Sequence, residues 1–220
     1  MVEVNFIVTG FGPFQGVTEN PTSMIVNNLI DYLCKEGLSS LASSIRTLPI
    51  IQTTADDART QIDRLEKEIC EERQRDDSIV YVLLHLGVNV EGESFQLETC
   101  AYNEASFRIP DEMGFQPSNL PISKGAATGS QLFTTLDVPE LVESMNRTCG
   151  DAVASSDPGR FVCNYTYYCS LDKCCNQKAE CLFLHVPPLS RASLPKQLHF
   201  VANLLQSIDE QVQRTHGQPS

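Results

Sequence analysis

Near the middle of the sequence, residues 79–86 read Ile79-Val80-Tyr81-Val82-Leu83-Leu84-His85-Leu86, and this run indicates the class of fold. It is almost continuously apolar and begins with β-branched residues. Strict alternation would indicate a strand with one solvent-exposed face, whereas an unbroken apolar run is typical of a strand that is covered on both faces. Even when it is extended to Val90, the run is too short to span a bilayer. We therefore expect a buried strand in a parallel sheet.

Strand-like and helix-like segments alternate on both sides of this run. Asn20 and Pro21 match the N-cap and the first turn of a helix. Further helices are expected at 54–73, 139–148, 161–171 and 194–215, and further strands at 4–9, 45–51, 96–103, 151–154 and 181–186. Alternation of this kind predicts one α/β domain over residues 1–216, with a mostly parallel twisted sheet and helices on both faces. Residues 217–220 are expected to fray.

Composition and charge exclude several classes of partner. The 220 residues carry 16 Lys and Arg against 28 Asp and Glu, a net charge of −12. Such a surface repels phosphate backbones and anionic lipid, so neither nucleic acid nor a membrane is an expected partner. The start of the chain lacks the features of a signal peptide. The chain has nine cysteines, whereas a secreted disulfide framework uses an even number. Together these observations predict a soluble, cytoplasmic protein with mostly free thiols.

The first candidate site follows the strand expected at 4–9. Ligands bind at the carboxyl ends of strands in such sheets, and this end is followed by Gly10-Phe11-Gly12-Pro13-Phe14-Gln15-Gly16. The third glycine of a dinucleotide-binding loop is missing, because Gln15 takes its place. Phe11 and Phe14 are either the lining of a small apolar pocket or ordinary core aromatics.

Two further candidates are a cysteine and a histidine. Cys163 falls in the first turn of the helix expected at 161–171, where unpaired backbone N–H groups stabilise a thiolate. It is either a nucleophile or a buried structural thiol. His185 ends the strand expected at 181–186 and is either a proton acceptor or a hydrogen-bonded core residue. His85 occupies the same kind of position, so position alone does not choose between the two histidines.

A metal site is the competing interpretation of the cysteine-rich region. Six potential ligands are close together in the sequence: Cys163, Cys169, Cys174, Cys175, Cys181 and His185. No C-x-x-C pair occurs among them, and their spacing matches no zinc module. We therefore expect no metal ion and no other cofactor.

Four segments, in this order, resemble the motifs of the pyroglutamyl-peptidase I family, the pyrrolidone-carboxylate peptidases. They are Val8-Thr9-Gly10-Phe11-Gly12-Pro13-Phe14 with Asn20-Pro21, Leu97-Glu98-Thr99-Cys100-Ala101-Tyr102-Asn103-Glu104-Ala105 continued by Arg108-Ile109-Pro110-Asp111-Glu112, Gly159-Arg160-Phe161-Val162-Cys163-Asn164-Tyr165-Thr166-Tyr167-Tyr168, and Phe183-Leu184-His185-Val186-Pro187-Pro188-Leu189. The resemblance covers most of the chain.

This resemblance implies a cysteine omega-peptidase that removes an N-terminal pyroglutamyl residue through a thioester acyl-enzyme. It implies a triad of Cys163 as nucleophile, His185 as base and Glu98 as the group that orients the imidazole. It also assigns substrate-binding roles to Phe11, Phe14, Asn20 and Phe161, and places Arg108 near the oxyanion site. The implied partners are peptides with an N-terminal pyroglutamate.

Two alternatives remain at this point. The chain could be a member of the family that binds pyroglutamyl ligands without cleaving them. It could also carry an unrelated activity on the same architecture, such as nucleoside phosphorolysis; that activity requires a phosphate site, and the sequence contains no basic glycine-rich loop. The sequence leaves open whether the protein is a monomer or a homo-oligomer.

Overall fold

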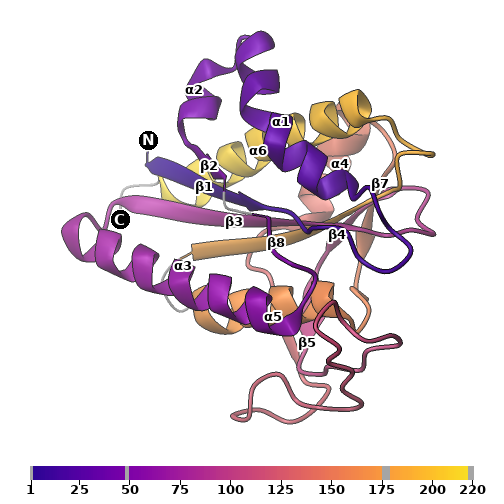
Figure 1. Ribbon diagram of the computed structural model, residues 1–220. Coiled ribbons are helices and arrows are strands. Elements are labelled where there is room, and N and C mark those ends of the chain that lie inside the picture. The colour runs from indigo at the N-terminus through magenta and orange to yellow at the C-terminus, as the bar shows by residue number, and fades with distance from the viewer. Residues whose placement is uncertain (1, 48–49, 175–178, 218–220) are drawn as a thin grey trace.

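Six strands form one twisted sheet in the computed structural model, which describes residues 2–47, 50–174 and 179–217 (Figure 1). The order across the sheet is β2-β1-β3-β8-β4-β7. Strands β2, β1, β3 and β8 run parallel to one another. Strands β4 and β7 run parallel to each other, and β4 pairs with β8 in the antiparallel direction. Their bounds are β1 Glu3–Thr9, β2 Ile45–Thr47, β3 Ile79–Val88, β4 Phe95–Glu98, β7 Ala152–Ser155 and β8 Ala179–Val186.

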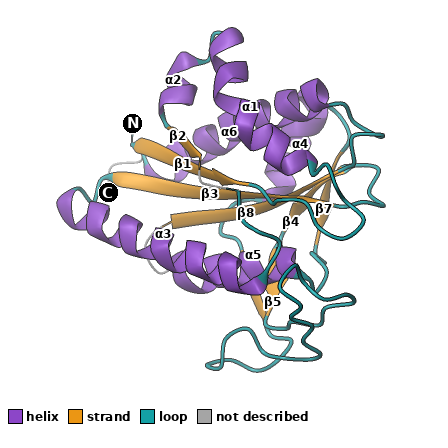
Figure 2. Ribbon diagram, in the orientation of Figure 1, coloured by secondary structure: helices purple, strands orange, loops and turns teal. Residues whose placement is uncertain are grey.

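Helices cover both faces of this sheet, as predicted (Figure 1). One face carries α1, α2, α4 and α6, and the other carries α3 and α5. Their bounds are α1 Pro21–Lys35, α2 Ser39–Ser43, α3 Ala55–Arg75, α4 Val138–Thr148, α5 Val162–Cys174 and α6 Leu194–His216. A small antiparallel sheet of β5 (Cys100–Tyr102) and β6 (Gln131–Phe133) lies beside α5. Long loops gather below it in Figure 2.

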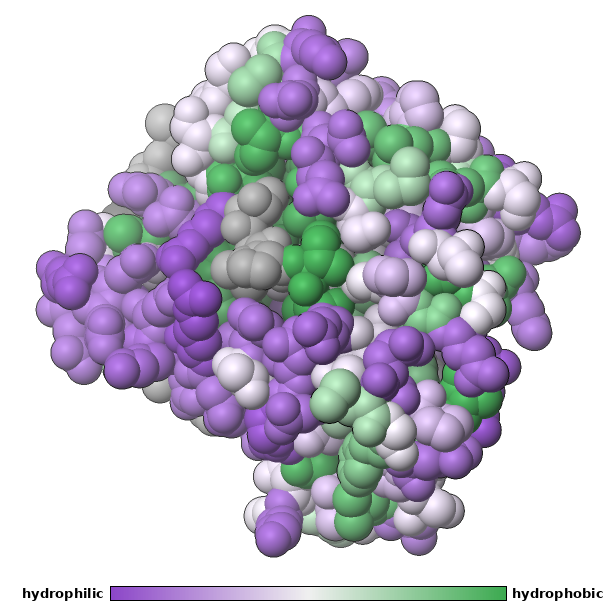
Figure 3. Space-filling model, in the orientation of Figure 1, coloured by the Kyte–Doolittle hydropathy of each residue, from purple (hydrophilic) through white to green (hydrophobic). Residues whose placement is uncertain are grey.

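Strand β3, which contains the apolar run 79–86, lies in the interior of the sheet between β1 and β8. Successive side chains of β3 point to opposite faces, so Val80, Val82 and Leu84 enter the core beneath α1 and α6, whereas Tyr81 and Leu83 enter the core beneath α3 and α5. Because both faces are covered, the run is apolar without alternation. The outer face of α3 is hydrophilic (Figure 3), which agrees with the charged residues between its buried positions.

Local capping explains where the helices begin. The Oδ1 atom of Asn20 accepts a hydrogen bond from the Thr22 backbone N–H at 3.1 Å, and Pro21 occupies the first position of α1. Thr54 caps α3 and Asp137 caps α4 in the same manner. These side chains satisfy backbone donors that have no partner within the helix. The predicted start of α1 is therefore confirmed together with its cause.

Three expectations about the strands are wrong in detail. Of the strand expected at 45–51, β2 covers Ile45–Thr47, residues 48 and 49 lie outside the described residues, and Ile50 is not in a strand. The strand expected at 96–103 is interrupted at Thr99, where the chain passes from β4 to β5. His85 does not end its strand, because β3 continues to Val88. Neither α2 nor β6 was predicted from the sequence. Of the tail expected to fray, residues 218–220 lie outside the described residues.

Candidate active site

Cys163 is the second residue of α5, at the carboxyl edge of the sheet. The preceding turn contains Gly159 with φ +76°, a backbone conformation that favours glycine. Asn164 then fixes the start of the helix: its Oδ1 accepts from the Tyr102 backbone N–H at 2.8 Å, and its Nδ2 donates to the carbonyls of Tyr102 and Glu104 at 2.9 Å. The nucleophile candidate is therefore held to β5 by a buried amide.

Gly87 makes room for the sulfur of Cys163. A Cβ atom at this glycine would lie 3.0 Å from the Cys163 Sγ and 2.7 Å from the Phe183 ring. Gly87 is also aligned with His185 in the pairing of β3 with β8. The thiol of Cys163 therefore lies over the sheet close to His185, near the carboxyl end of β8. A glycine within a buried strand is a sequence signal for such close approach.

His185 contacts a wholly buried carboxylate on the neighbouring antiparallel strand. The His185 Nδ1 lies 2.8 Å from the Glu98 Oε1, and Glu98 has no solvent exposure. Among the described residues, the second oxygen of this carboxylate has no hydrogen-bond partner. Tyr167 donates from its hydroxyl to the Glu98 backbone carbonyl at 3.0 Å and so fixes the strand at this residue. The three residues of the predicted triad are thus brought together.

The environment of His185 favours the protonated imidazole. Burial lowers its pKa, but the hydrogen bonds with Cys163 and Glu98 and the charges of both groups outweigh burial and raise the pKa to about 10. An imidazolium held between a sulfur and a carboxylate can return a proton to a leaving group. The geometry is that of a nucleophile, a general acid–base and an orienting carboxylate.

His85 belongs to a different network. Its Nδ1 lies 2.7 Å from the Thr9 hydroxyl and its Nε2 lies 2.7 Å from the Ser170 hydroxyl. All three side chains are completely buried. Burial lowers the pKa of His85 to about 3, so the ring is neutral. His85 thus joins β1, β3 and α5 within the core, and of the two histidines only His185 lines the cavity described below.

The predicted aromatic residues line a cavity of about 270 Å³ in front of Cys163 and His185. Phe11 is buried, and Phe14 lies with its ring centroid 6.3 Å from that of Phe161. Phe107 packs edge-on against Phe161 with the ring centroids 4.8 Å apart. Phe11 and Phe14 come from the loop after β1 and Phe161 from the turn before α5, and together these rings form an apolar wall of the cavity. Phe11 both belongs to the core and lines the cavity, whereas Phe14 is half-buried and lines the cavity without joining the core.

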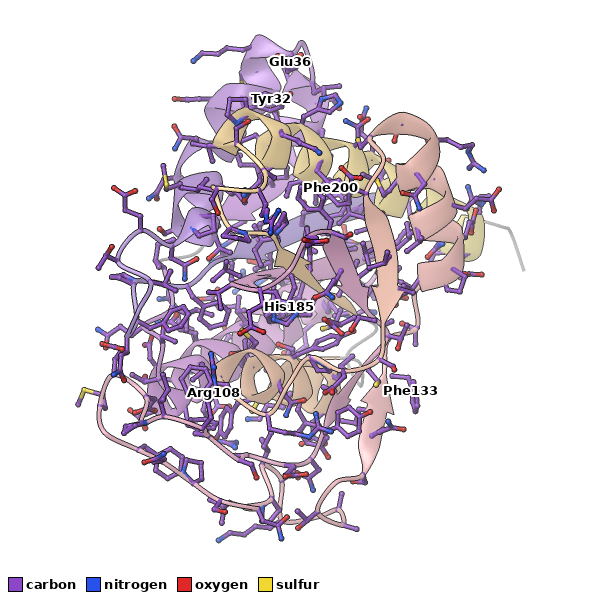
Figure 4. All side chains as sticks on the ribbon, turned by 90° about the vertical axis from the view of Figure 1, so that its right-hand side faces the viewer. Tyr32, Glu36, Arg108, Phe133, His185 and Phe200 are labelled. Carbon is purple, nitrogen blue, oxygen red and sulfur yellow. The ribbon has the colours of Figure 1, made fainter. Side chains whose placement is uncertain are left out.

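Asn20 and Arg108 also line the cavity, in unequal roles. The amide of Asn20 is occupied by the protein itself, since its Nδ2 donates to the Gly12 carbonyl at 2.9 Å while its Oδ1 serves Thr22. Arg108 is exposed, and its guanidinium makes no hydrogen bond or ion pair with any described residue. In Figure 4 Arg108 lies below His185 on the loop that follows β5. Asn20 shapes the cavity, whereas Arg108 remains available to a ligand.

Several residues that line the cavity were not predicted from the sequence, among them Asn89 and Gln96. Asn89 and Gln96 line the cavity beyond His185, and they contact each other through a hydrogen bond of 2.9 Å. Asn89 follows β3 and donates its backbone N–H to the Val186 carbonyl of β8, and Gln96 pairs with His185 of the same strand. Sequence spacing does not reveal that β8 brings the two residues together. No sequence signal could have found this pair.

The cysteine-rich region does not gather into a metal site in the part of the chain that is described. Seven cysteines are described as free thiols. Among the described residues, no group of three or more His, Cys, Asp or Glu side chains is arranged to hold an ion. The side chains of Cys174 and Cys175, two of the six potential ligands, lie outside the described residues.

Comparison with known proteins assigns the chain to a family. A sequence model described as pyroglutamyl peptidase matches residues 4–208. The chain belongs to the pyroglutamyl peptidase family. Pyrrolidone-carboxylate peptidase of Pyrococcus furiosus is 28% identical over 194 residues, which cover 86% of this chain and 84% of that protein. The protein of the same name from Enterococcus faecalis is 29% identical over 193 residues, with 86% and 81% covered.

Solved structures of pyroglutamyl peptidases have the same fold. Pyroglutamyl peptidase I of Bacillus amyloliquefaciens aligns with a TM-score of 0.75 at 23% identity, covering 94% of this chain and 96% of that one. Pyrrolidone carboxyl peptidase of Thermus thermophilus aligns with a TM-score of 0.73 at 24% identity, covering 92% and 98%. The predicted fold class, the predicted family and its enzyme class, a peptidase, are confirmed. Within the described residues, no helix is long and apolar enough to cross a membrane.

Proposed function

We propose that this pyroglutamyl peptidase hydrolyses the bond after an N-terminal pyroglutamyl residue of peptides, with Cys163, His185 and Glu98 as the catalytic triad. The observation that carries the proposal is the 2.8 Å contact between His185 and the buried Glu98, at the wall of the cavity that also receives Cys163. A buried carboxylate bound to one imidazole orients that ring toward the thiol.

The first half of the reaction forms a thioester. The proton shared by Cys163 and His185 stays on the imidazole while the sulfur attacks the pyroglutamyl carbonyl carbon. When the tetrahedral intermediate collapses, the carbon–nitrogen bond breaks and His185 gives the proton to the leaving amine. The pyroglutamyl group stays on Cys163, and the shortened peptide leaves with a free N-terminus.

The second half restores the enzyme. A water molecule gives a proton to His185 and attacks the thioester carbon. The carbon–sulfur bond breaks, pyroglutamate is released, and the proton returns to the sulfur of Cys163. Backbone N–H groups at the start of α5 and the free guanidinium of Arg108 are our candidates for stabilising the negative oxygen of both tetrahedral intermediates.

The aromatic wall gives the proposed selectivity. Phe11, Phe14 and Phe161 form an apolar slot for a small, flat, neutral lactam ring. An N-terminal proline has a ring of similar size, but it carries a charged amine and lacks the lactam carbonyl. Transfer of that charge into an apolar slot is unfavourable, so a prolyl peptide is rejected. Asn20 contributes by holding the loop on which Phe11 and Phe14 lie.

We also propose that the protein acts in the cytoplasm. The free state of the seven described cysteines supports this location, because oxidising compartments favour disulfides. A thiol nucleophile likewise works only while it is reduced.

The test compares hydrolysis of a pyroglutamyl coumarin amide by the wild type, Cys163→Ala and Cys34→Ala. Cys34 is an exposed thiol on α1 and provides the matched control. We expect cleavage by the wild type and the control, loss of at least about 10³-fold in kcat for Cys163→Ala, and no cleavage of the prolyl amide. Turnover retained by a folded Cys163→Ala protein would refute the mechanism. Binding of a pyroglutamyl ligand without cleavage by the wild type would favour a non-catalytic family member.

A further inference from the structure

The order of strands places the two halves of a bound substrate on opposite sides of Cys163. Phe11 and Phe14 of the aromatic slot follow β1, whereas Cys163 and His185 lie over the neighbouring strands β3 and β8. Gln96 lies one strand further, on β4. If the pyroglutamyl ring occupies the slot, the rest of the peptide must leave the scissile bond in the opposite direction. The leaving segment therefore passes over β4, in the direction of Gln96.

Gln96 faces the cavity for a reason that the pairing of strands explains. It lies directly opposite His185 in the antiparallel pairing of β4 with β8. Directly paired residues point to the same face of a sheet. Its neighbours Phe95 and Leu97 enter the core on the opposite face. The Gln96 side chain therefore lies beside His185 and lines the cavity.

The orientation of the Gln96 amide is determined by its neighbours. The Glu91 backbone N–H donates to the Asn89 Oδ1 at 3.2 Å, so the amide nitrogen of Asn89 must point elsewhere. That nitrogen donates to the Gln96 Oε1 at 2.9 Å. Because the oxygen of Gln96 is used, its Nε2 group, with two N–H donors, is left without a partner among the described residues.

We propose that Gln96 donates a hydrogen bond from Nε2 to the carbonyl oxygen of the residue that follows pyroglutamate. This inference rests on the proposed function and adds to it a specificity-determining residue for the leaving segment. A peptide carries a carbonyl at this position, whereas a pyroglutamyl anilide does not. Gln96 therefore makes the enzyme favour peptides over simple aryl amides, and Asn89 keeps its amide in the required orientation.

The test is a ratio of kcat/KM values for two substrates, pyroglutamyl-alanine amide and pyroglutamyl p-nitroanilide. Gln96→Met keeps the length of the side chain and removes both donors. We expect the peptide-to-anilide ratio to fall about three- to tenfold, as for loss of one neutral hydrogen bond. Gln206→Met, at an exposed glutamine of α6 on the other face of the sheet, is the matched control with an unchanged ratio.

A second variant tests the orientation without touching Gln96. Asn89→Asp places a carboxylate oxygen where the amide nitrogen was, so the Gln96 amide turns to donate to it. The oxygen of Gln96 then faces the cavity and repels the peptide carbonyl, and the ratio falls in the same direction.

Each outcome is decisive. A ratio within twofold of the wild type in both variants overturns the proposal. Loss of both activities in both variants also overturns it, because Gln96 would then act on His185. Failure of the wild type to cleave either substrate instead refutes the proposed function.

Discussion

The imidazole of His185 and the carboxylate of Glu98 form a buried pair, with Nδ1 and Oε1 2.8 Å apart, on antiparallel strands. Glu98 is completely enclosed, and its second oxygen has no hydrogen-bond partner among the described residues. Among the described residues, the imidazole of His185 is therefore the one hydrogen-bond partner of this carboxylate. In a site of low dielectric such a charge has a large effect on the proton equilibrium of its partner.

Glu98→Gln tests this effect, because it keeps an oxygen for Nδ1 and removes the charge. Glu98 is one of the groups that raise the pKa of His185, so this pKa falls in the variant. We expect the alkaline limb of kcat/KM to move to lower pH and kcat to fall about 10²-fold. The measurement is a rate profile from pH 5 to 10, with Glu143→Gln on α4 as control. An alkaline limb at the wild-type position would contradict the role of the carboxylate.

Alkylation distinguishes Cys163 from the other thiols. Cys163 lines the cavity beside His185, where a small reagent can reach its sulfur. Cys169 is buried, and burial raises its pKa to about 12, so it stays protonated and unreactive. We expect iodoacetamide at neutral pH to abolish activity in step with modification of Cys163, while Cys169 stays unmodified, as followed by peptide mass spectrometry.

Exposed Cys34 provides the control for this experiment. Cys34→Ser should lose activity at the wild-type rate, because alkylation of an exposed thiol on α1 leaves the cavity untouched. Complete inactivation with an unmodified Cys163 peptide would show that another thiol is essential.

Gly87→Ala tests how closely the sulfur approaches the sheet. The added carbon would lie 2.7 Å from the Phe183 ring and 3.0 Å from the Cys163 Sγ, so at least one of them must move. A small displacement of a nucleophile has a large effect on rate, and we expect kcat to fall about 10²-fold. Gly125→Ala is the control, because its added carbon comes no closer than 3.9 Å to Ser123. Full activity of Gly87→Ala would show that the sulfur has room to shift.

The sequence predicted most of the fold and the triad, but not the parts that depend on pairing between distant strands. The run at Ile79 is recognisable because burial on both faces leaves it apolar throughout. The passage from β4 to β5 at Thr99 is not recognisable, because it is made by backbone contacts with Ser155 and Thr134, far away in the sequence. The contact of Asn89 with Gln96 escapes for the same reason. Residue patterns report burial, whereas register depends on the whole sheet.

His85 allows a prediction about stability in acid. Its pKa is lowered to about 3 in the folded protein, so between pH 6.5 and about 3 the unfolded chain binds a proton that the folded protein does not. The contribution of a neutral His85 to stability is therefore present above pH 6.5 and is lost as the pH falls. His85→Gln removes this titration. The variant should be less stable at pH 7.5, because the Thr9 and Ser170 hydroxyls lose a partner, but it should lose less stability on acidification.

Urea unfolding at pH 7.5 and pH 4.5 measures both effects. We expect the drop in the free energy of unfolding between the two pH values to be about 2 kcal/mol smaller in His85→Gln than in the wild type. His199→Gln, at an exposed histidine of α6, should show the wild-type drop. Equal drops in all three proteins would mean that His85 is protonated in the folded state at pH 4.5, and the buried chain Thr9–His85–Ser170 would then have to open before the protein unfolds.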